Sequence, residues 1–340
     1  MAASIPMPEP MEAKLVGELP TEGDWQFEPK WDGFRAIVRR QGDAVDILSK
    51  SGKDLARYFP EIVALIAETT DDRFVVDGEL VVPVGDVLSF DALQARLHPA
   101  ESRIRRLSRE TPAQLIMFDC LHLGTSNLAG DPLSERRERL EAFHVKNGFP
   151  SLLLSPCSLH RSDAEAWLKT AGGALDGVVA KALNEPYRPG ERAMLKVKQR
   201  RTADCVVGGF RRAKDGRGVG SLLLGLYDGE GKLDHVGFTS GIADDERMAL
   251  AARLEALIAT PGFTGKAPGG PSRWNNGKAS EWEPLRAELV VEVLYDQVTA
   301  NRFRHGTKLV RWRPDKAPRQ CTMDQLACEL RPSELNAIIT

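Results

Sequence analysis

A lysine with a carboxylate, a glycine and an arginine at short fixed spacings stands near the start of the chain. Lys30 is followed by Asp32, Gly33 and Arg35, and a strand-like run begins at Phe34. This spacing predicts that Lys30 lies in a turn just before the strand, either as a solvated hairpin charge or as a nucleophile. With an ordinary pKa of about 10.4, only about one lysine in a thousand is neutral near pH 7.4. A nucleophilic Lys30 therefore needs neighbouring cations or desolvation to lower its pKa.

Six more runs along the chain place charged or aromatic side chains beside strand-like residues. They are Ser49-Lys50-Ser51-Gly52 (with Phe59-Pro60-Glu61 behind it), Val76-Asp77-Gly78-Glu79-Leu80, Met117-Phe118-Asp119, Asp176-Gly177-Val178-Val179-Ala180-Lys181, Leu195-Lys196-Val197-Lys198 and Leu309-Val310-Arg311-Trp312-Arg313-Pro314-Asp315-Lys316. Alone, each has an ordinary interpretation as a solvated strand position, a turn or a core residue. For their order to be accidental, every ordinary interpretation would have to hold at once.

Together with the octet Glu28–Arg35, these runs resemble, in order, motifs I, Ia, III, IIIa, IV, V and VI of the covalent nucleotidyltransferases. That superfamily comprises ATP-dependent DNA ligases, RNA ligases and mRNA capping enzymes. The resemblance spans roughly residues 20–320 and implies that Lys30 attacks the α-phosphate of a nucleotide, forming a lysyl–NMP phosphoramidate. The first and last motifs look most like bacterial stand-alone ATP-dependent DNA ligases of the repair and end-joining kind.

The resemblance also assigns roles to single residues. Lys196 and Lys198 would lower the pKa of Lys30 and neutralise charge on the α-phosphate. Phe118 would stack on the purine, and Arg35 would bind the ribose or orient a carboxylate. The full set of implied ATP-binding residues is Glu28, Lys30, Arg35, Lys50, Glu79, Phe118, Lys196, Lys198, Arg311, Arg313 and Lys316. The implied ligands of Mg²⁺, with Mn²⁺ as an alternative, are Glu79, Asp176 and Asp32.

Two positions depart from the usual pattern of the superfamily. Lys50 stands where an arginine is usual, and a lysine lacks the planar fork that grips phosphate. Asp176 replaces the usual glutamate and is one methylene shorter, so we expect it to contact the metal through a water.

The elements that must position these residues predict an α+β chain of two domains. Residues 1–200 would form a nucleotidyltransferase (ATP-grasp-like ligase) domain with antiparallel sheets. The first 29 of these residues would be extended. Residues 201–340 would form a small OB-fold β-barrel with a short tail, because short strands dominate there around one helix, Asp244–Ile258. We expect Ser134 to cap a helix in the first domain and Asp244 or Asp245 to cap that in the second.

Loops and a linker complete this prediction. Gln199–Thr202 is the expected linker, and the Gly/Pro-rich stretch Pro261–Lys278 is an expected surface loop. The run Asp215–Gly220 imitates a phosphate loop, but its place between strands favours a hairpin. The chain contains no G-x-x-x-x-G-K-[ST] run, so a P-loop ATPase is not supported.

The charge of the whole chain conceals a division. The formal net charge is −2 and the pI about 6.4, which alone argues against a nucleic-acid-binding protein. Residues 1–198, however, hold 25 basic and 30 acidic side chains, whereas residues 199–319 hold 20 basic and 15 acidic ones. The second segment is therefore basic by itself, as expected of a domain that binds DNA phosphates.

Several other classes of protein are disfavoured. No stretch approaches 18 consecutive apolar residues, so no membrane span is expected. The N-terminus lacks the basic and apolar regions of a secretory signal. The five cysteines form no C-x-x-C pair, which disfavours a disulfide framework or a four-cysteine zinc site. A cytoplasmic, nucleoid-associated protein is the expectation.

The resemblance implies a compact DNA ligase that acts in DNA repair as a monomer on nicked duplex DNA. Only 29 residues precede Lys30, so no large N-terminal DNA-binding domain is expected. Two alternatives remain at this point: an RNA ligase or GTP-dependent capping-type enzyme, and an idle OB-type scaffold that only binds nucleic acid. Partners among repair or end-joining proteins are left open.

Overall fold

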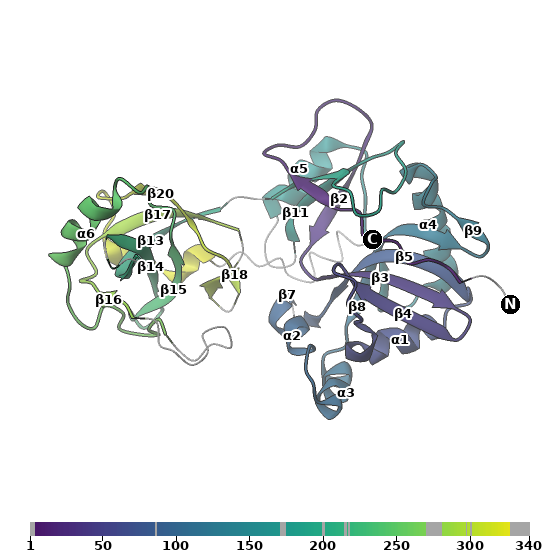
Figure 1. Cartoon of the computed structure of the whole chain (residues 1–340), viewed down its shortest axis with the longest axis horizontal. Coiled ribbons are helices and arrows are strands. Elements are labelled where there is room, and N and C mark those ends of the chain that lie inside the picture. Colours follow the sequence, from purple (N-terminus) through teal and green to yellow (C-terminus); the bar gives the residue numbers. More distant parts are fainter. Residues whose placement is uncertain are drawn as a thin grey trace. The chain divides into compact units, whose positions relative to one another are not determined.

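Figure 1 shows the chain as a computed structural model that separates into two compact units. The residues that the structure describes are 4–85, 87–170, 175–198, 201–213, 216, 218–269, 281–296, 298–299 and 301–326. The first unit contains the described residues up to Lys198, and the second contains those from Arg201 to Leu326. Each unit has its own hydrophobic core and is described by itself.

The first unit contains two sheets that are mostly antiparallel. The six-stranded sheet has the order β10 (Leu152–Leu154), β8 (Gln114–Leu123), β5 (Arg73–Val81), β3 (Phe34–Gln41), β4 (Ala44–Ser49), with β9 (Ser126–Asn127) on β8. The four-stranded sheet has the order β1 (Ala13–Leu15), β12 (Met194–Val197), β11 (Leu175–Ala182), β2 (Trp25–Trp31). A short pair, β6 (Pro83–Val84) and β7 (Val87–Leu88), stands apart.

Helices cover one face of the six-stranded sheet. Its core joins Ile62 and Ile66 of α1 to Leu140 and Phe143 of α4 and to alternate strand residues such as Val76. The helices of this unit are α1 (Pro60–Ala67), α2 (Phe90–Ala95), α3 (Glu101–Glu110), α4 (Leu133–Asn147) and α5 (Arg161–Thr170), with a 3₁₀ turn at Ala56–Tyr58.

The opposite face of that sheet packs against the four-stranded sheet and the N-terminal segment. Ile37 and Val75 cluster there with Met11 and Met194. Because side chains alternate along a strand, the odd-numbered residues of β3 and β5 point to this second face. The register pairs Arg35 with Glu79 and Ile37 with Asp77. The strand period therefore delivers three charged side chains into the space between the sheets.

The second unit is a curled antiparallel sheet. Its order is β15 (Leu233–Thr239), β14 (Val219–Tyr227), β13 (Arg201–Arg212), β17 (Val290–Tyr295), β20 (Lys308–Trp312), with β16 (Glu283–Pro284) on β13 and a separate pair β18 (Val298–Thr299) and β19 (Arg302–Phe303). Helix α6 (Arg247–Glu255) and 3₁₀ turns at Pro318–Gln320 and Met323–Leu326 complete it. An isolated parallel bridge pairs Thr239, at the end of β15, with Thr307, which immediately precedes β20. This is consistent with an OB fold, although no continuous ladder closes a barrel within the described residues.

Three local predictions are wrong. Lys30 lies on β2 rather than in a turn. Ser134 does not cap α4, because the amides of Leu133 and Ser134 donate to the carbonyls of Glu185 and Leu183, each at 3.1 Å. Helix α6 begins at Arg247, so Asp244 and Asp245 lie before it, and Asp244 forms an ion pair with Arg247 at 2.8 Å instead of capping the helix.

Several predicted segments lie wholly or partly outside the described residues. Of the predicted linker, Gln199 and Arg200 are not described, whereas Arg201 and Thr202 already belong to β13. The Asp215–Gly220 run is described only in part, and its last two residues begin β14. The loop from Pro261 is described to Gly269 and contains no helix or strand there, and the C-terminal tail beyond Leu326 is not described.

Candidate active site

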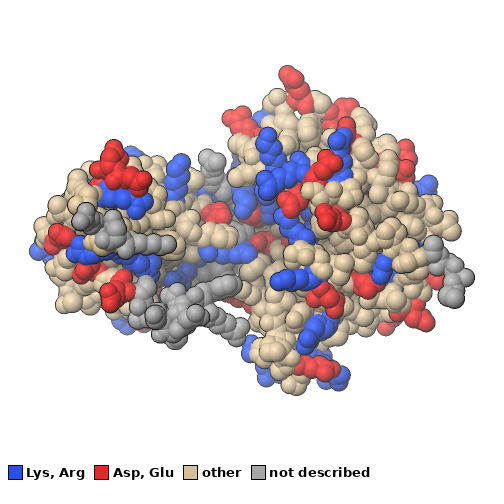
Figure 2. All heavy atoms as spheres, viewed as in Figure 1, with Lys and Arg blue, Asp and Glu red and all other residues tan. Residues whose placement is uncertain are grey.

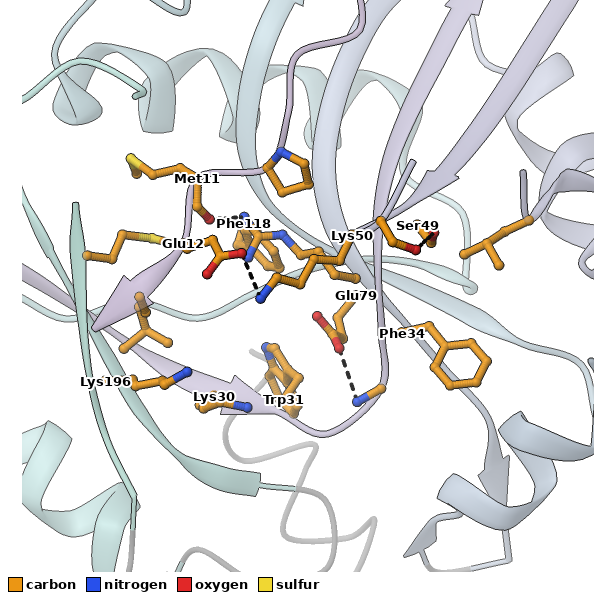
Figure 3. Close-up of a pocket in the computed structure, with 18 of the residues that line it drawn as sticks. Met11, Glu12, Lys30, Trp31, Phe34, Ser49, Lys50, Glu79, Phe118 and Lys196 are labelled. Atoms are coloured by element: carbon orange, nitrogen blue, oxygen red, sulfur yellow. Dashed lines mark hydrogen bonds and ion pairs between the residues drawn. The ribbon is translucent and has the colours of Figure 1, made fainter. Parts of the chain in front are cut away.

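A cavity of about 950 Å³ opens between the two sheets of the first unit. Strands β2, β3, β5 and β12 contribute walls to it, together with the turn after β4 and residues 10–13 of the N-terminal segment (Figure 3). A volume of this size accommodates a nucleoside triphosphate. Of the residues predicted to bind ATP, it brings together Glu28, Lys30, Arg35, Lys50, Glu79, Phe118 and Lys196.

Lys30 is held by a bulge in the neighbouring strand. Strand β11 pairs with β2 so that Gly177 lies opposite Lys30, and the register shifts between Leu175 and Gly177. Asp176 stands at this shift, and its Oδ2 lies 2.7 Å from Lys30 Nζ and 2.9 Å from Lys198 Nζ. Gly177 has φ +140°, and a Cβ there would lie 2.1 Å from the carbonyl oxygen of Val197. Only glycine fits, so this position fixes the carboxylate that bridges two ammonium groups.

The lysine pKa values differ from the prediction. Burial lowers the pKa of Lys30, but the Asp176 carboxylate, assisted by Glu79 and Asp32, outweighs burial, so the pKa of Lys30 is raised. The predicted lowering is wrong in this structure because a carboxylate lies in direct contact with the lysine. The cluster acts instead on Lys196, whose pKa is lowered by burial and by Lys30 and Lys198.

Glu79 faces the same end of the cavity. Its Oε1 accepts a hydrogen bond from the Gly33 amide at 3.2 Å, in the turn that joins β2 to β3 (Figure 3). Burial raises the pKa of Glu79 to about 7, against the opposing effects of Lys30 and Arg35. A carboxyl with this pKa can hold a proton near neutrality in the absence of a bound cation.

The ring of Phe118, which was predicted to stack on the purine, lies close to two cations. The Arg35 guanidinium and the Lys181 ammonium each lie 4.7 Å from the centre of its ring. Lys181 also donates to the Phe118 carbonyl at 3.2 Å and pairs with Glu28 at 2.7 Å. Arg35 donates to both oxygens of Asp77, at 2.5 and 2.6 Å. Two cations held by carboxylates therefore lie beside this aromatic side chain, which also lines the cavity.

Lys50 occupies the rim of the cavity. Its ammonium pairs with Glu12 at 2.9 Å while 60% of the side chain stays exposed. Arg192 approaches the same carboxylate at 3.5 Å. Lys50 lowers the pKa of Glu12. Lys50 thus lines the cavity with its ammonium paired to Glu12, and phosphate binding by it stays a prediction.

The predicted metal ligands supply only oxygen atoms, which suits Mg²⁺. Asp176 Oδ2 is already engaged by two ammonium groups, and Glu79 by an amide. Within the described part of the chain, no three acidic, histidine or cysteine side chains form a cation cage by themselves. The residues fit a metal that shares its coordination with phosphate oxygens and waters better than one held by protein alone.

The last motif lies in the second unit. Asp204 binds Arg313 through both oxygens, at 2.9 and 3.0 Å, and Lys316 at 2.7 Å. Arg311 pairs with Glu292 at 2.6 Å. The predicted contact of these three cations with pyrophosphate stays a prediction.

Sequence reasoning missed four residues around the cavity. Asp77 and Lys181 stood within quoted motifs but received no role, although their place on the strands beside Glu79 and Asp176 was a signal. Glu12 and Tyr187 carried no signal, because they come from an extended segment and from the loop between β11 and β12.

Comparison with known proteins agrees with this geometry. The ATP dependent DNA ligase domain family matches residues 10–198, and the ATP dependent DNA ligase C terminal region matches residues 215–316. The chain belongs to the ATP-dependent DNA ligases and is thus an enzyme, which confirms the resemblance seen in the motifs. An RNA ligase or capping enzyme is not favoured.

Within this family the chain is similar to a particular group of ligases. It is 46% identical to DNA ligase C1 of Mycolicibacterium smegmatis, over 94% of this chain and 93% of that protein. It is 42% identical to DNA ligase C of Mycobacterium tuberculosis, over 95% and 94%. The solved mycobacterial DNA ligase D complexed with ATP and MES is 28% identical, with a TM-score of 0.50, over 93% of this chain and 98% of that one. The α+β architecture with an OB-type second domain is shared with such ligases.

Proposed function

We propose that this chain seals nicks in duplex DNA and that Lys30 carries the AMP. Lys30 Nζ attacks the α-phosphate of ATP, a P–N bond forms, and the bond to pyrophosphate breaks. The AMP then passes to the 5′-phosphate of the nick, releasing the lysine. Finally the 3′-hydroxyl attacks that phosphate, a phosphodiester forms, and AMP departs. The observation that supports this proposal most directly is that Lys30, Lys196 and Glu79 line one nucleotide-sized cavity in a chain of this family.

The side chains around Lys30 divide the work of the first step. Asp176 Oδ2, 2.7 Å from Nζ, aims the lysine and is the nearest acceptor for the proton that Nζ must lose. Lys196 and Lys198 neutralise charge that develops on the α-phosphate. Glu79, Asp176 and Asp32 would hold Mg²⁺ or Mn²⁺, which when bound screens the charge of the phosphates. Phe118 and Arg35 hold the base and ribose, with Glu28 fixing Lys181 beneath them.

The second unit would serve both the nucleotide and the DNA. Arg311, Arg313 and Lys316 would contact the leaving pyrophosphate, and basic side chains of the segment 199–319, which is basic by itself, would bind backbone phosphates. In the view of Figure 2, basic and acidic side chains are interspersed over both units. Because the proposed DNA contacts are to backbone phosphates, we expect the affinity for DNA to fall steeply with salt and to depend little on sequence. The same proposal includes that the protein acts as a monomer, that it works beside repair proteins and that it is associated with the nucleoid. No described helix is long and apolar enough to cross a membrane.

Substrate selection tests this proposal. The protein, stripped of any bound AMP with pyrophosphate, is incubated with Mg²⁺ and α-labelled ATP or GTP and then with nicked DNA or nicked RNA. The proposal predicts label on the protein from ATP and sealing of the DNA nick. Lys30→Ala should abolish both, whereas Lys169→Ala, an exposed lysine on α5, should not. Labelling by GTP or sealing only of RNA would favour a capping-type enzyme or RNA ligase, and DNA binding without any adduct would favour a scaffold.

A further inference from the structure

A buried tyrosine, Tyr187, is hydrogen-bonded to groups behind the residues that line the nucleotide cavity. Tyr187 is 4% exposed and lies in the loop between β11 and β12. Its hydroxyl donates to Asp77 Oδ2 at 2.7 Å and accepts from the Met11 amide at 2.8 Å. Both hydrogen-bonding capacities of the hydroxyl are therefore used on groups of separate segments.

Asp77 links Tyr187 to Arg35, which lines the cavity. Its side chain is fully buried, and its two oxygens accept both hydrogen bonds from Arg35 as well as that from Tyr187. Arg35 in turn lies 4.7 Å over the Phe118 ring and donates to the Met11 carbonyl at 3.2 Å. The amide and the carbonyl of Met11 are thus bound at the two ends of one chain of contacts.

This arrangement fixes the direction of a flexible side chain. A bidentate pair with Asp77 leaves Arg35 free to pivot with its partner unless the carboxylate itself is held. Tyr187 holds that carboxylate, because its hydroxyl is the further donor to Oδ2. Burial and Asp77 raise the pKa of Tyr187, so the hydroxyl remains a donor at every working pH. The same hydroxyl also ties down residues 10–13, which form a wall of the cavity.

We propose that Tyr187 is a positioning residue for ATP binding, which acts through Asp77 on Arg35 and through Met11 on the N-terminal wall of the cavity. This inference rests on the proposed function of the cavity. A purely structural tyrosine would change stability without changing the affinity for ATP in an Arg35-dependent way.

The test is a double-mutant cycle on lysine adenylylation by the full chain. Tyr187→Phe removes only the hydroxyl, and Arg35→Ala removes the side chain on which it is proposed to act. We expect Tyr187→Phe to raise the KM for ATP roughly tenfold, the size of one lost buried hydrogen bond, with the maximal rate within about twofold. In the Arg35→Ala background the same change should raise the KM by only about threefold, because only the contact through Met11 then remains. Tyr227→Phe is the matched control, because Tyr227 is also buried but lies in the second unit under Arg319.

Three readouts separate the outcomes. An unchanged KM in Tyr187→Phe, or an equal rise in both backgrounds, would overturn the inference. Hydrogen exchange of the peptide that contains Met11 should accelerate in Tyr187→Phe and not in Tyr227→Phe, and protection equal to that of the wild type would also count against it. A wild-type protein that forms no adduct at all would instead contradict the proposed function of the cavity.

Discussion

Each unit contains a carboxylate that bridges two cations, and the surroundings of the two differ. Asp176 joins Lys30 and Lys198 in the first unit, and Asp204 joins Arg313 and Lys316 in the second. Around Asp176 a further lysine, Lys196, has a lowered pKa. Around Asp204 each cation is in direct contact with a carboxylate, since Asp315 also binds Arg313 and Glu292 binds Arg311.

The comparison shows what separates a reactive cluster from a stable one. A cavity in which the ammonium group of Lys196 is held beside those of Lys30 and Lys198 is prepared for an anion, because a phosphate that enters relieves repulsion already present. A surface cluster with matched charges is held by its own partners and must exchange them before it can bind a phosphate. The first cluster should therefore govern chemistry, and the second should govern the stability of its unit in the absence of ligand.

The largest expected effect is on the rate of lysine adenylylation, when a lysine of the first cluster is removed. Lys196→Ala and Lys198→Ala should each slow lysine adenylylation by about 10²- to 10³-fold, because each removes a fixed positive charge beside the developing negative charge. Single-turnover labelling with ATP measures this rate. Lys14→Ala, an exposed lysine on the neighbouring strand β1, is the matched control and should stay within about twofold. Loss of less than about fivefold in both lysine variants would contradict a catalytic cluster.

Substitutions in the second cluster, around Asp204, should mainly lower the stability of the second unit. Asp204→Asn leaves Arg313 and Lys316 together without their shared charge, and we expect the free energy of unfolding of the second unit to fall by about 2 kcal/mol. Urea titration followed by hydrogen exchange of β13 and β17 measures this. The exposed partner gives the control, since Asp315→Asn should leave the urea midpoint of the same unit unchanged. Equal effects of the two substitutions would remove the distinction between them.

Acid should weaken the second unit through a buried histidine. Burial, with the cations Arg302 and Arg211, lowers the pKa of His235 to about 4, while a backbone contact with Gly237 opposes this. The unfolded chain binds this proton below about pH 6.5, so stability is lost as the pH falls from about 6.5 to about 4. At pH 5 the loss should be about 1 to 2 kcal/mol. Urea titrations at pH 7 and pH 5 should show it in the wild type and not in His235→Asn; a loss of the same size in both would exclude His235 as its cause.

The smallest expected effect on stability is that of removing Arg311 from the second unit. Arg311 is 61% exposed and pairs with Glu292 across neighbouring strands. Arg311→Ala should therefore change the free energy of unfolding by less than about 0.5 kcal/mol. If it also serves the pyrophosphate, adenylylation should fall while urea stability does not. A loss of stability without a loss of rate would make Arg311 a structural residue only.

Strand period explains how much of the site the sequence could predict. Arg35 and Glu79 were predicted from the motifs that they belong to, and alternation along β3 and β5 explains why both lie on one face. The charge state of Lys30 was predicted wrongly, because spacing cannot show that a bulge at Asp176 brings a carboxylate into contact with it. Likewise, Ser134 was expected to cap a helix whose first amides are bound by a distant backbone segment. Tyr187 and Glu12 needed tertiary structure, since neither belongs to a periodic element that faces the cavity.

The most direct test of the central claim is to locate the AMP within the lysine cluster. The wild-type protein is incubated with ATP and Mg²⁺, digested under conditions that preserve the acid-labile P–N bond, and analysed by tandem mass spectrometry. Lys30 as the nucleophile predicts one AMP on the peptide that contains Lys30, and none in Lys30→Ala. AMP on Lys196, Lys198 or Lys50, or labelling that persists in Lys30→Ala, would contradict it.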